Sequence, residues 1–166
     1  MKKNQETQPA DAAAPPRPTP SSPAVSSRMS RQRRQDTAME VAVRKLLHSG
    51  GLRYRVGLPV PGIRRRTIDI AFTRAKVAIF LDGCFWHGCP EHATRPKANA
   101  AWWQEKLARN VARDLETTEH LERAGWLVLR FWEHEAPQAA AQRIRAEVAA
   151  VRSGPQRRFG NDRGAG

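Results

Sequence analysis

The sequence has few cysteines and no long apolar run. It lacks a stretch of about 20 consecutive apolar residues, which excludes a membrane-spanning helix. No apolar segment follows the start Met1-Lys2-Lys3, so we expect no secretory signal. Its two cysteines, Cys84 and Cys89, lie too close together for a disulfide scaffold. They favour a reducing compartment and a metal site. No internal repeat is visible.

Acidic residues are also scarce. The chain has 16 acidic and 29 basic residues, a net charge of +13. Residues 1–35 carry +5, residues 152–166 carry +3 and the rest carries +5. Such a charge favours a polyanionic partner, above all nucleic acid, because neutralising phosphates releases counterions. Solubility or a codon bias toward arginine are the alternative explanations.

The length of 166 residues suits one domain with two tails. Residues 1–35 hold six of the twelve prolines and few sizeable apolar residues. They cannot offset a backbone entropy cost of about 1–2 kcal/mol per residue, and we expect a disordered basic arm. Residues 152–166 are rich in Arg and Gly and read as a second tail. The folded domain is predicted at 36–151.

Seven elements are predicted between the tails, in the order α-β-β-β-α-β-α. Gly50-Gly51 ends the first helix, and Gly125 ends a long one along which Trp103, Leu107, Val111 and Leu115 recur at helical spacing. The order and periodicity indicate a three-layer α/β fold. The predicted helices span 37–48, 99–124 and 137–151, the strands 52–56, 67–72, 77–81 and 126–132, with basic turns at 57–66 and an irregular segment at 82–97.

A metal site is predicted in the irregular segment. Cys84, Cys89 and His92 fall within nine residues, and His134 follows directly after a strand and Trp132-Glu133. Two thiolates and two imidazoles suit a closed, tetrahedral, structural Zn²⁺ site. The alternatives are buried thiols with surface histidines, or Glu135 as the fourth ligand in place of His134.

A second group of residues suggests acid-base chemistry. Asp69 stands in an apolar strand between Ile68 and Ile70, and its side chain is expected on the face opposite these isoleucines. A carboxylate there is costly unless a metal or a cation compensates it. Asp82 ends the following strand, and His87 comes five residues later.

Phosphodiester hydrolysis needs such residues. A catalytic Mg²⁺ prefers oxygen ligands, which Asp69 and the backbone carbonyl of Leu81 could supply. A neutral imidazole at His87 could take the proton of the attacking water. Glu40 on the first helix and Asp114 on the long helix add carboxylates.

Each of these residues also has a structural interpretation. Asp69 could form an ion pair with one of Arg64 to Arg66, and His87 could be a spare zinc ligand. Glu40 could be only the capping-box glutamate that follows Thr37. Asp114 could form a helix-surface pair with Arg113 or Arg109.

Paired aromatic residues suggest contact with DNA bases. Phe85 and Trp86 are adjacent in the irregular segment, and Trp102 and Trp103 begin the long helix. Consecutive side chains in a loop cannot easily share one interior face. They suit insertion between base steps, which costs a few kcal/mol of unstacking that stacking offsets. Alternatively, one member of each pair packs inward.

The run from Phe80 to His92, with the string Gly-Cys-Phe-Trp-His, resembles the signature loop of the very short patch repair (Vsr) endonucleases. The likeness covers about residues 28–135. It includes the strings Arg28-Met-Ser-Arg, Asp36-Thr-Ala-Met-Glu40, Thr67-Ile-Asp69, Trp103-Gln-Glu-Lys106, Asn110-Val-Ala-Arg-Asp114, Gly125-Trp-Leu-Val-Leu and Trp132-Glu133-His134.

This resemblance implies a restriction-endonuclease-like fold with a mixed central sheet, flanking helices and a zinc-bound loop. It implies nicking 5′ of the thymine of a T:G mismatch left by deamination of 5-methylcytosine. Matching positions assign the site roles: Asp69 binds the metal, His87 lies near the scissile phosphate, Glu40 and Asp114 support them, Phe85, Trp86 and Trp103 insert beside the mismatch, and Cys84 and His134 bind zinc.

Three positions depart from the family pattern. Asp82 stands where the best-known members carry a second active-site histidine, which turns a proton donor into a possible metal ligand. Cys89 stands where a histidine ligand is usual and His134 where a cysteine is usual. Tetrahedral zinc accepts either combination. The spacing to His92 differs by one residue.

The predicted partner is double-stranded DNA with a T:G mismatch, and the family implies a functional link to a DNA cytosine-5 methyltransferase. We expect a monomer in the bacterial cytoplasm, associated with the nucleoid, and an arm that tracks DNA through Arg28 and Arg31. The alternatives are an endonuclease of the restriction or mobile-element type without mismatch preference, or a non-catalytic zinc DNA-binding module.

Overall fold

The computed structural model describes residues 37–92, 94 and 96–154. The predicted arm, with Arg28 and Arg31, lies outside the described residues, as does all of the predicted tail beyond residue 154. The predictions for these two segments therefore stay predictions.

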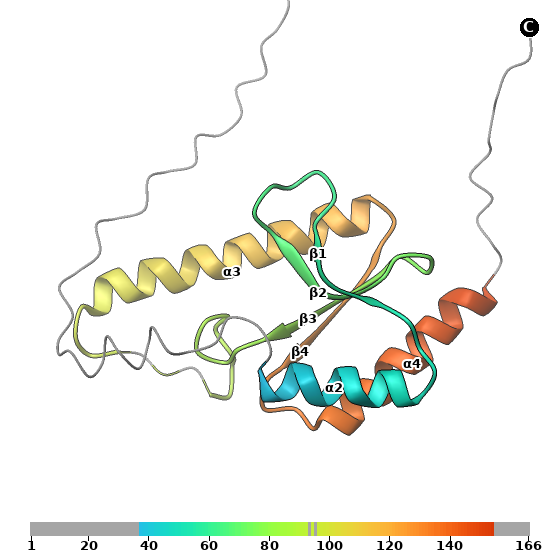
Figure 1. The fold of residues 1–166 in the computed structure, drawn as a ribbon. Coiled ribbons are helices and arrows are strands. Elements are labelled where there is room, and N and C mark those ends of the chain that lie inside the picture. The colour runs from blue at the N-terminus through green and yellow to red at the C-terminus, as the bar shows by residue number, and fades with distance from the viewer. Residues whose placement is uncertain (1–36, 93, 95, 155–166) are drawn as a thin grey trace, which may run out of the picture.

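The predicted order of elements is confirmed (Figure 1). The last helix runs two residues further than the sequence pattern predicts, and the long helix begins one residue later. The elements are α2 (Ala38–Ser49), β1 (Arg55–Pro59), β2 (Thr67–Phe72), β3 (Val77–Asp82), α3 (Ala100–Arg123), β4 (Leu127–Trp132) and α4 (Pro137–Ser153).

The four strands form one mixed sheet in the order β1-β2-β3-β4. Neighbours β1 and β2, and β2 and β3, are antiparallel, whereas β3 and β4 are parallel and are connected through α3. The parallel pair runs from Val77 opposite Leu127 to Asp82 opposite Trp132. The parallel strands β3 and β4 therefore end at the same side of the sheet, and the residues that follow them meet there.

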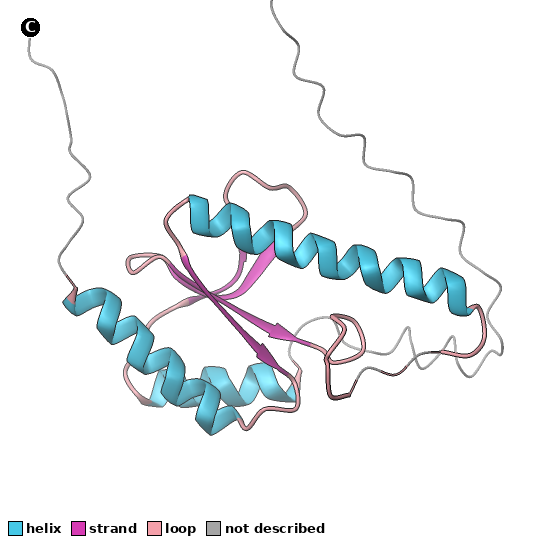
Figure 2. Ribbon diagram, turned by 180° about the vertical axis from the view of Figure 1, so that it is seen from behind, coloured by secondary structure: helices cyan, strands magenta, loops and turns pink. Residues whose placement is uncertain are grey.

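Helices cover both faces of the sheet, which confirms the three-layer α/β fold (Figure 2). One face packs against α2 and α4 through a cluster that includes Val43, Leu47, Phe131 and Ile144. The other packs against the C-terminal half of α3, where Leu121 is fully buried. Burial of each such apolar side chain contributes about 1.5–3 kcal/mol to the stability of the fold.

The predicted first strand is displaced. Strand β1 spans Arg55–Pro59 rather than 52–56, and Leu58 pairs with Ile68 in the segment predicted as turns. Tyr54 belongs to the connection from α2: its hydroxyl donates to the Arg44 carbonyl at 2.8 Å and its ring packs edge-on against Phe72. The alternation of the sequence at 52–56 thus reflects packing of a connecting segment.

The apolar residues that predicted α3 lie on an exposed part of the helix. Val111 is 45% exposed and Leu115 is 60% exposed, whereas Thr117 and Leu121 are buried. Figures 1 and 2 show that the first half of α3, which ends at Val111, extends beyond the sheet, and that its later turns lie over the strands. Leu115 belongs to the later half but lies about half a turn around the helix from the buried Thr117. Helical spacing identified the helix but not its buried face.

Strand β2 is irregular at Asp69. Ile70 packs on the face under α2 and α4, but Ile68 packs with Ala71 on the α3 face. The prediction that both isoleucines share one face is therefore wrong. The antiparallel pairing of β2 with β3 ends at Ile70 opposite Ile79, where strict alternation of side chains is lost.

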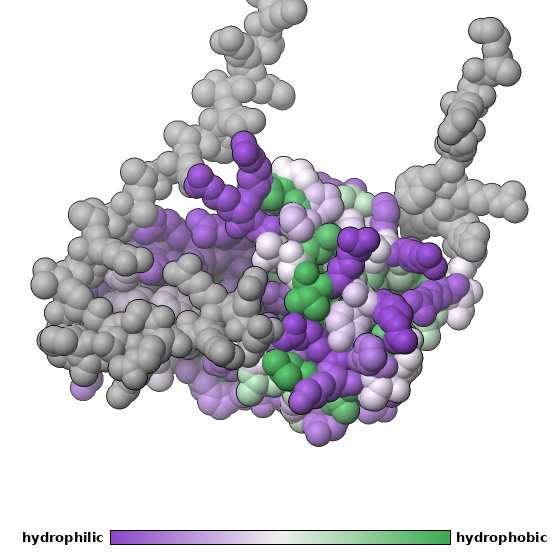
Figure 3. Space-filling model, viewed as in Figure 1, coloured by the Kyte–Doolittle hydropathy of each residue, from purple (hydrophilic) through white to green (hydrophobic). Residues whose placement is uncertain are grey.

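The surface is mainly hydrophilic. In Figure 3 the visible apolar residues of this face form small groups among polar ones. Within 37–92, 94 and 96–154, no helix has the length and apolar character needed to cross a membrane.

Candidate active site and metal centre

Four predicted zinc ligands converge beyond the ends of β3 and β4. The side-chain donors of Cys84, Cys89, His92 and His134 all lie within 4.8 Å of one another. Cys84 Sγ lies 3.1 Å from Nδ1 of His134, and Cys89 Sγ lies 3.7 Å from the same atom and 3.9 Å from Nδ1 of His92. In a tetrahedral zinc site, neighbouring donors lie roughly 3.3–3.8 Å apart. This donor set therefore fits a closed zinc site.

The loop that supplies three of these donors is hydrogen-bonded to the residues that follow the sheet strands. The Cys84 N–H donates to Oε1 of Glu133 at 2.7 Å, and the Glu133 N–H donates to the Asp82 carbonyl at 2.9 Å. Glu135, the alternative fourth ligand, accepts the Trp132 N–H at 2.7 Å and stands outside the cluster of four. His134 is therefore better placed than Glu135 to complete the donor set.

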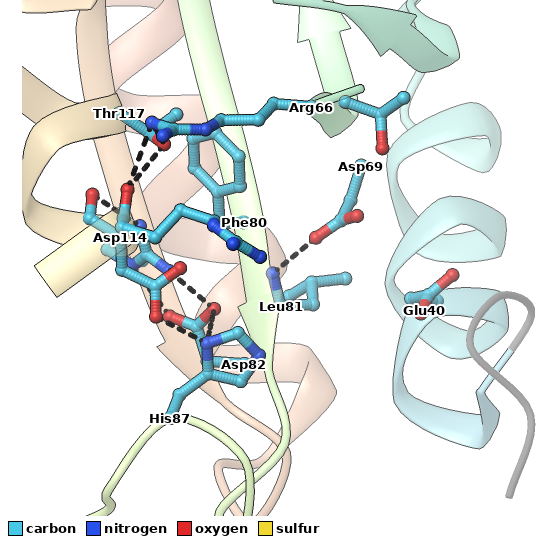
Figure 4. A pocket seen from close by; sticks show the side chains of 12 residues that line it. Glu40, Arg66, Asp69, Phe80, Leu81, Asp82, His87, Asp114 and Thr117 are labelled. Atoms are coloured by element: carbon cyan, nitrogen blue, oxygen red, sulfur yellow. Dashed lines mark hydrogen bonds and ion pairs between the residues drawn. The ribbon is translucent and has the colours of Figure 1, made fainter. Parts of the chain in front are cut away.

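A separate pocket of about 230 Å³ lies over the ends of β2 and β3 (Figure 4). Asp69 from β2 and His87 from the loop both line it, although they are 18 positions apart in the sequence. Besides Phe80 and Leu81, its lining is polar or charged: Glu40, Arg66, Thr67, Asp69, Asp82, His87, Arg113, Asp114, Thr117 and Arg130. The predicted catalytic residues are thus brought to one pocket from α2, β2, β3, α3 and the loop.

Asp69 is held at the pocket wall by the neighbouring strand. Its Oδ2 accepts the Leu81 N–H at 2.8 Å (Figure 4). The pKa of Asp69 is raised to about 6, chiefly by burial; the charges of Glu40 and Asp82 contribute to the rise, while the Leu81 hydrogen bond and Arg130 oppose it. An excess of negative charge around a buried carboxylate is what a bound cation relieves.

His87 is paired with Asp114. Its Nδ1 lies 2.5 Å from Oδ2 of Asp114 and 3.6 Å from Oδ1 of Asp82. Burial lowers the pKa of His87, but the Asp114 hydrogen bond and the charges of both carboxylates outweigh it, so that the net shift is upward. Burial likewise opposes the shift of Asp114, yet His87 and Arg130 hold its pKa below the ordinary value. His87 therefore belongs to the pocket and not to the cysteine-histidine cluster.

Arg130 is a pocket residue that the sequence interpretation missed. Its Nε and Nη2 donate to the two oxygens of Asp82, both at 2.7 Å, and Nη2 lies 3.1 Å from Oδ1 of Asp114. Asp82 is only 5% exposed, so this pair is buried. The sequence feature that could have revealed Arg130 is its charge within the strand Leu127–Trp132, whose other residues are apolar.

Glu40 takes part in the helix cap and also lines the pocket. The Thr37 hydroxyl accepts its N–H and donates to its Oε1, each at 3.2 Å, so Glu40 takes part in the N-terminal cap of α2. It is also 8% exposed and lines the pocket, opposite the side of His87 and Asp114 (Figure 4). Arg66, a candidate partner of Asp69, instead pairs with Glu116 at 2.6 Å.

The aromatic residues of the loop and of α3 form one cluster. Ring centroids of Phe85 and Trp86 lie 4.9 Å apart, and Trp103 lies 5.4 Å from Phe85 and 6.0 Å from Trp86. All are half-buried. The Lys106 ammonium lies 4.8–5.5 Å from the ring centroids of Trp86, Trp102 and Trp103. Mutual packing of loop and helix therefore accommodates the adjacent aromatics.

Comparison with known proteins adds the family. The chain is 43% identical over 130 residues to the type II nicking enzyme V.NaeI of Lentzea aerocolonigenes, covering 76% of this chain and 78% of that protein. The family model for the DNA mismatch endonuclease Vsr matches residues 21–92. The chain belongs to the Vsr family of DNA endonucleases.

Other Vsr-type relatives agree. The type II nicking enzyme V.NmeDIP of Neisseria meningitidis serogroup C is 35% identical over 125 residues, covering 72% of this chain and 82% of its own. The DNA mismatch endonuclease Vsr of Escherichia coli K12 is 35% identical over 101 residues, covering 60% and 62%. The match to the Vsr family model includes Asp69, His87 and three of the four clustered metal donors.

Proposed function

We propose that this protein nicks one DNA strand 5′ of the thymine of a T:G mismatch, in very short patch repair of deaminated 5-methylcytosine. The observation that carries the proposal is that Asp69 and His87 line one pocket. A metal-binding carboxylate beside an imidazole is the pair that metal-assisted hydrolysis of a phosphodiester needs.

Asp69, Glu40 and the backbone carbonyl of Leu81 would hold a divalent cation, for which Mg²⁺ is the natural choice because the donors are hard oxygens. The raised pKa of Asp69 supports this assignment, since crowded negative charge favours a cation. When bound, Mg²⁺ stabilises the charge that develops on the phosphate oxygens.

His87 would move the proton. The ionised Asp114 accepts from Nδ1 of His87, which leaves Nε2 to take a proton from the attacking water. The Asp114 carboxylate then stabilises the imidazolium that forms. Asp82, the position where a second histidine is usual in the family, would act through its ion pair with Arg130.

The cysteine-histidine cluster would hold a structural Zn²⁺ through Cys84, Cys89, His92 and His134. A closed set of four protein ligands leaves no position for substrate, which suits a structural ion. The ion would fix the loop that carries His87, because Cys84 and Cys89 flank this histidine in the sequence.

Phe85, Trp86 and Trp103 would insert beside the mismatch. Their edge-to-face packing forms one aromatic surface on the loop that carries His87, and stacking of bases on such a surface offsets the cost of separating a weakened base step. Arg28 and Arg31 would bind the DNA backbone. We further propose a monomer in the bacterial cytoplasm, associated with the nucleoid, whose T:G substrates arise from a DNA cytosine-5 methyltransferase of the same cell.

A nicking assay on duplexes labelled on either strand tests the proposal. We expect the protein to cut only the thymine strand of a T:G duplex, on the 5′ side of the thymine, and only with Mg²⁺ present. The matched T:A duplex of the same sequence is the control and should be cut at least 100-fold more slowly.

Equal cutting of the matched duplex, or cutting of both strands, would indicate a restriction-type enzyme without mismatch preference. Tight binding of DNA with no product at any metal concentration would indicate a non-catalytic zinc module.

A further inference from the structure

The Arg130 side chain contacts two acidic residues of the pocket, Asp82 and Asp114. Asp114 is in turn paired with His87. The guanidinium belongs to strand β4, whereas Asp82 ends β3 and Asp114 lies on α3. It therefore links three elements at the pocket, and its guanidinium carbon lies over the Phe80 ring, 4.8 Å from the ring centroid.

The hydrogen bonds of Arg130 occupy every donor that a guanidinium has. Nε and one Nη2 hydrogen serve the two Asp82 oxygens, and Nη2 also reaches Asp114. Nη1 faces the Asp114 carbonyl and Oγ1 of Thr118, each at the longer distance of 3.4 Å. A guanidinium carries five N–H donors, so Arg130 has none left for a phosphate.

We infer that Arg130 is a positioning residue for the reaction: it fixes the Asp114 carboxylate, and through it the His87 imidazole, at the pocket. This inference rests on the proposed nicking function. Asp82 holds the guanidinium in its fork-to-fork pairing, and the guanidinium in turn holds Asp114 against the imidazole.

The central variant is Arg130→Lys. Lysine keeps the positive charge but cannot bridge two carboxylates with a planar fork. We expect the single-turnover nicking rate at saturating T:G duplex to fall at least tenfold, while Kd for the same duplex, measured without divalent metal, stays within twofold of the wild type.

A spectroscopic readout separates positioning from mere stability. The proton shared by His87 and Asp114 gives a downfield imidazole N–H resonance in protein labelled with ¹⁵N-histidine, and only four other histidines compete for assignment. His87→Gln identifies the signal. We expect Arg130→Lys to shift or broaden it, because Asp114 is no longer fixed.

Arg143→Lys is the matched control. Arg143 lies on α4 with its guanidinium 5.7 Å from the Phe131 ring centroid, but it is exposed and outside the pocket lining. It should leave the rate, Kd and the His87 resonance as in the wild type.

The double variant Asp82→Asn/Arg130→Gln covers the case that Arg130→Lys does not fold, since it leaves no unpaired charge at the Asp82 site. We expect it to fold, to nick slowly and to lack the wild-type His87 resonance.

Three results would overturn the inference. A double variant that recovers both rate and resonance would make the pair purely structural. If Arg130→Lys weakened DNA binding but left the nicking rate unchanged, Arg130 would be a DNA contact. A His87 resonance in Arg130→Lys identical to that of the wild type would show that Arg130 is not needed to fix the Asp114 carboxylate. If the wild-type protein nicks no duplex, the proposed function fails, and the resonance alone decides the role of Arg130.

Discussion

The cysteine-histidine cluster and the acidic pocket both lie at the end of β3, yet they are built in opposite ways. Three of the four cluster donors come from one short loop and face one another within 4.8 Å. The pocket takes its carboxylates and its histidine from two strands, two helices and a loop, and it leaves a cavity between them. The first arrangement suits an ion that never leaves, and the second suits an ion and a phosphate that must enter.

Removal of zinc should have the largest effect. Structural zinc contributes about 10–16 kcal/mol in small peptides, so we expect Cys84→Ser/Cys89→Ser to lower the free energy of unfolding by roughly 5 kcal/mol or more. Metal analysis and thermal unfolding measure this. His92→Ala should lose zinc affinity, whereas His48→Ala, at an exposed site on α2, should not. If a strong chelator left the melting temperature of the wild-type protein unchanged, the zinc assignment would be contradicted.

Substitution at Asp69 should abolish chemistry and leave the fold intact. Asn keeps the size of the side chain and can still accept the Leu81 N–H, but it is a poor metal ligand. We expect Asp69→Asn to lower the single-turnover nicking rate at least about 10³-fold, equivalent to about 4 kcal/mol. Glu119→Gln, an exposed site on α3, is the matched control. A rate for Asp69→Asn within tenfold of the wild type would remove Asp69 from the active site.

The same variant should stabilise the protein in the absence of divalent metal. The pKa of Asp69 is raised from 3.8 to about 6 by burial and neighbouring charge, so ionisation costs more in the folded than in the unfolded chain. This cost is absent below pH 3.8, grows as pH rises toward 6 and is complete above it. At pH 8 we expect Asp69→Asn to gain about 1–2 kcal/mol of unfolding free energy in urea titrations. A gain of the same size at pH 4 would show that charge is not the cause.

Exchange of a zinc donor should have the smallest effect. His134→Cys restores the residue usual in the family, and tetrahedral zinc accepts three thiolates with one imidazole. We expect zinc binding to persist, with nicking within about threefold and stability within about 1 kcal/mol of the wild type. By contrast, Asp69→Glu should cost at least about 100-fold in rate, because a longer carboxylate misplaces the ligand. A large loss in His134→Cys would show that the cluster is as intolerant as the pocket.

How far the sequence predicts each region follows from how it is built. The cluster could be read from donors within nine residues plus His134 after a strand. The pocket could be assembled only with a family resemblance, because no local spacing relates Asp69 to Asp114. Arg130 escaped notice because its partners, Asp82 and Asp114, are 48 and 16 positions away.

The fold shows the same division. Strand β2 was predicted at its observed bounds, since arginines before it and the loop Thr73–Lys76 after it flank a β-branched run. The exposure of Val111 and Leu115 could not be foreseen, because it depends on how the helix lies over the sheet. The displacement of β1 could not be foreseen either, because it depends on the packing of Tyr54 against Phe72. Periodicity reports which residues share a face of an element and does not say what that face meets.

The central claim is that Asp69 and His87 act on the same phosphate. A double-mutant cycle with Asp69→Asn, His87→Gln and the combined variant, read as single-turnover nicking of a T:G duplex, tests it most directly. Residues that act as a unit are non-additive, so the double variant should be about as slow as the slower single variant. Rate losses that simply multiply would mean that the two side chains act independently, and the account of one shared site would be wrong.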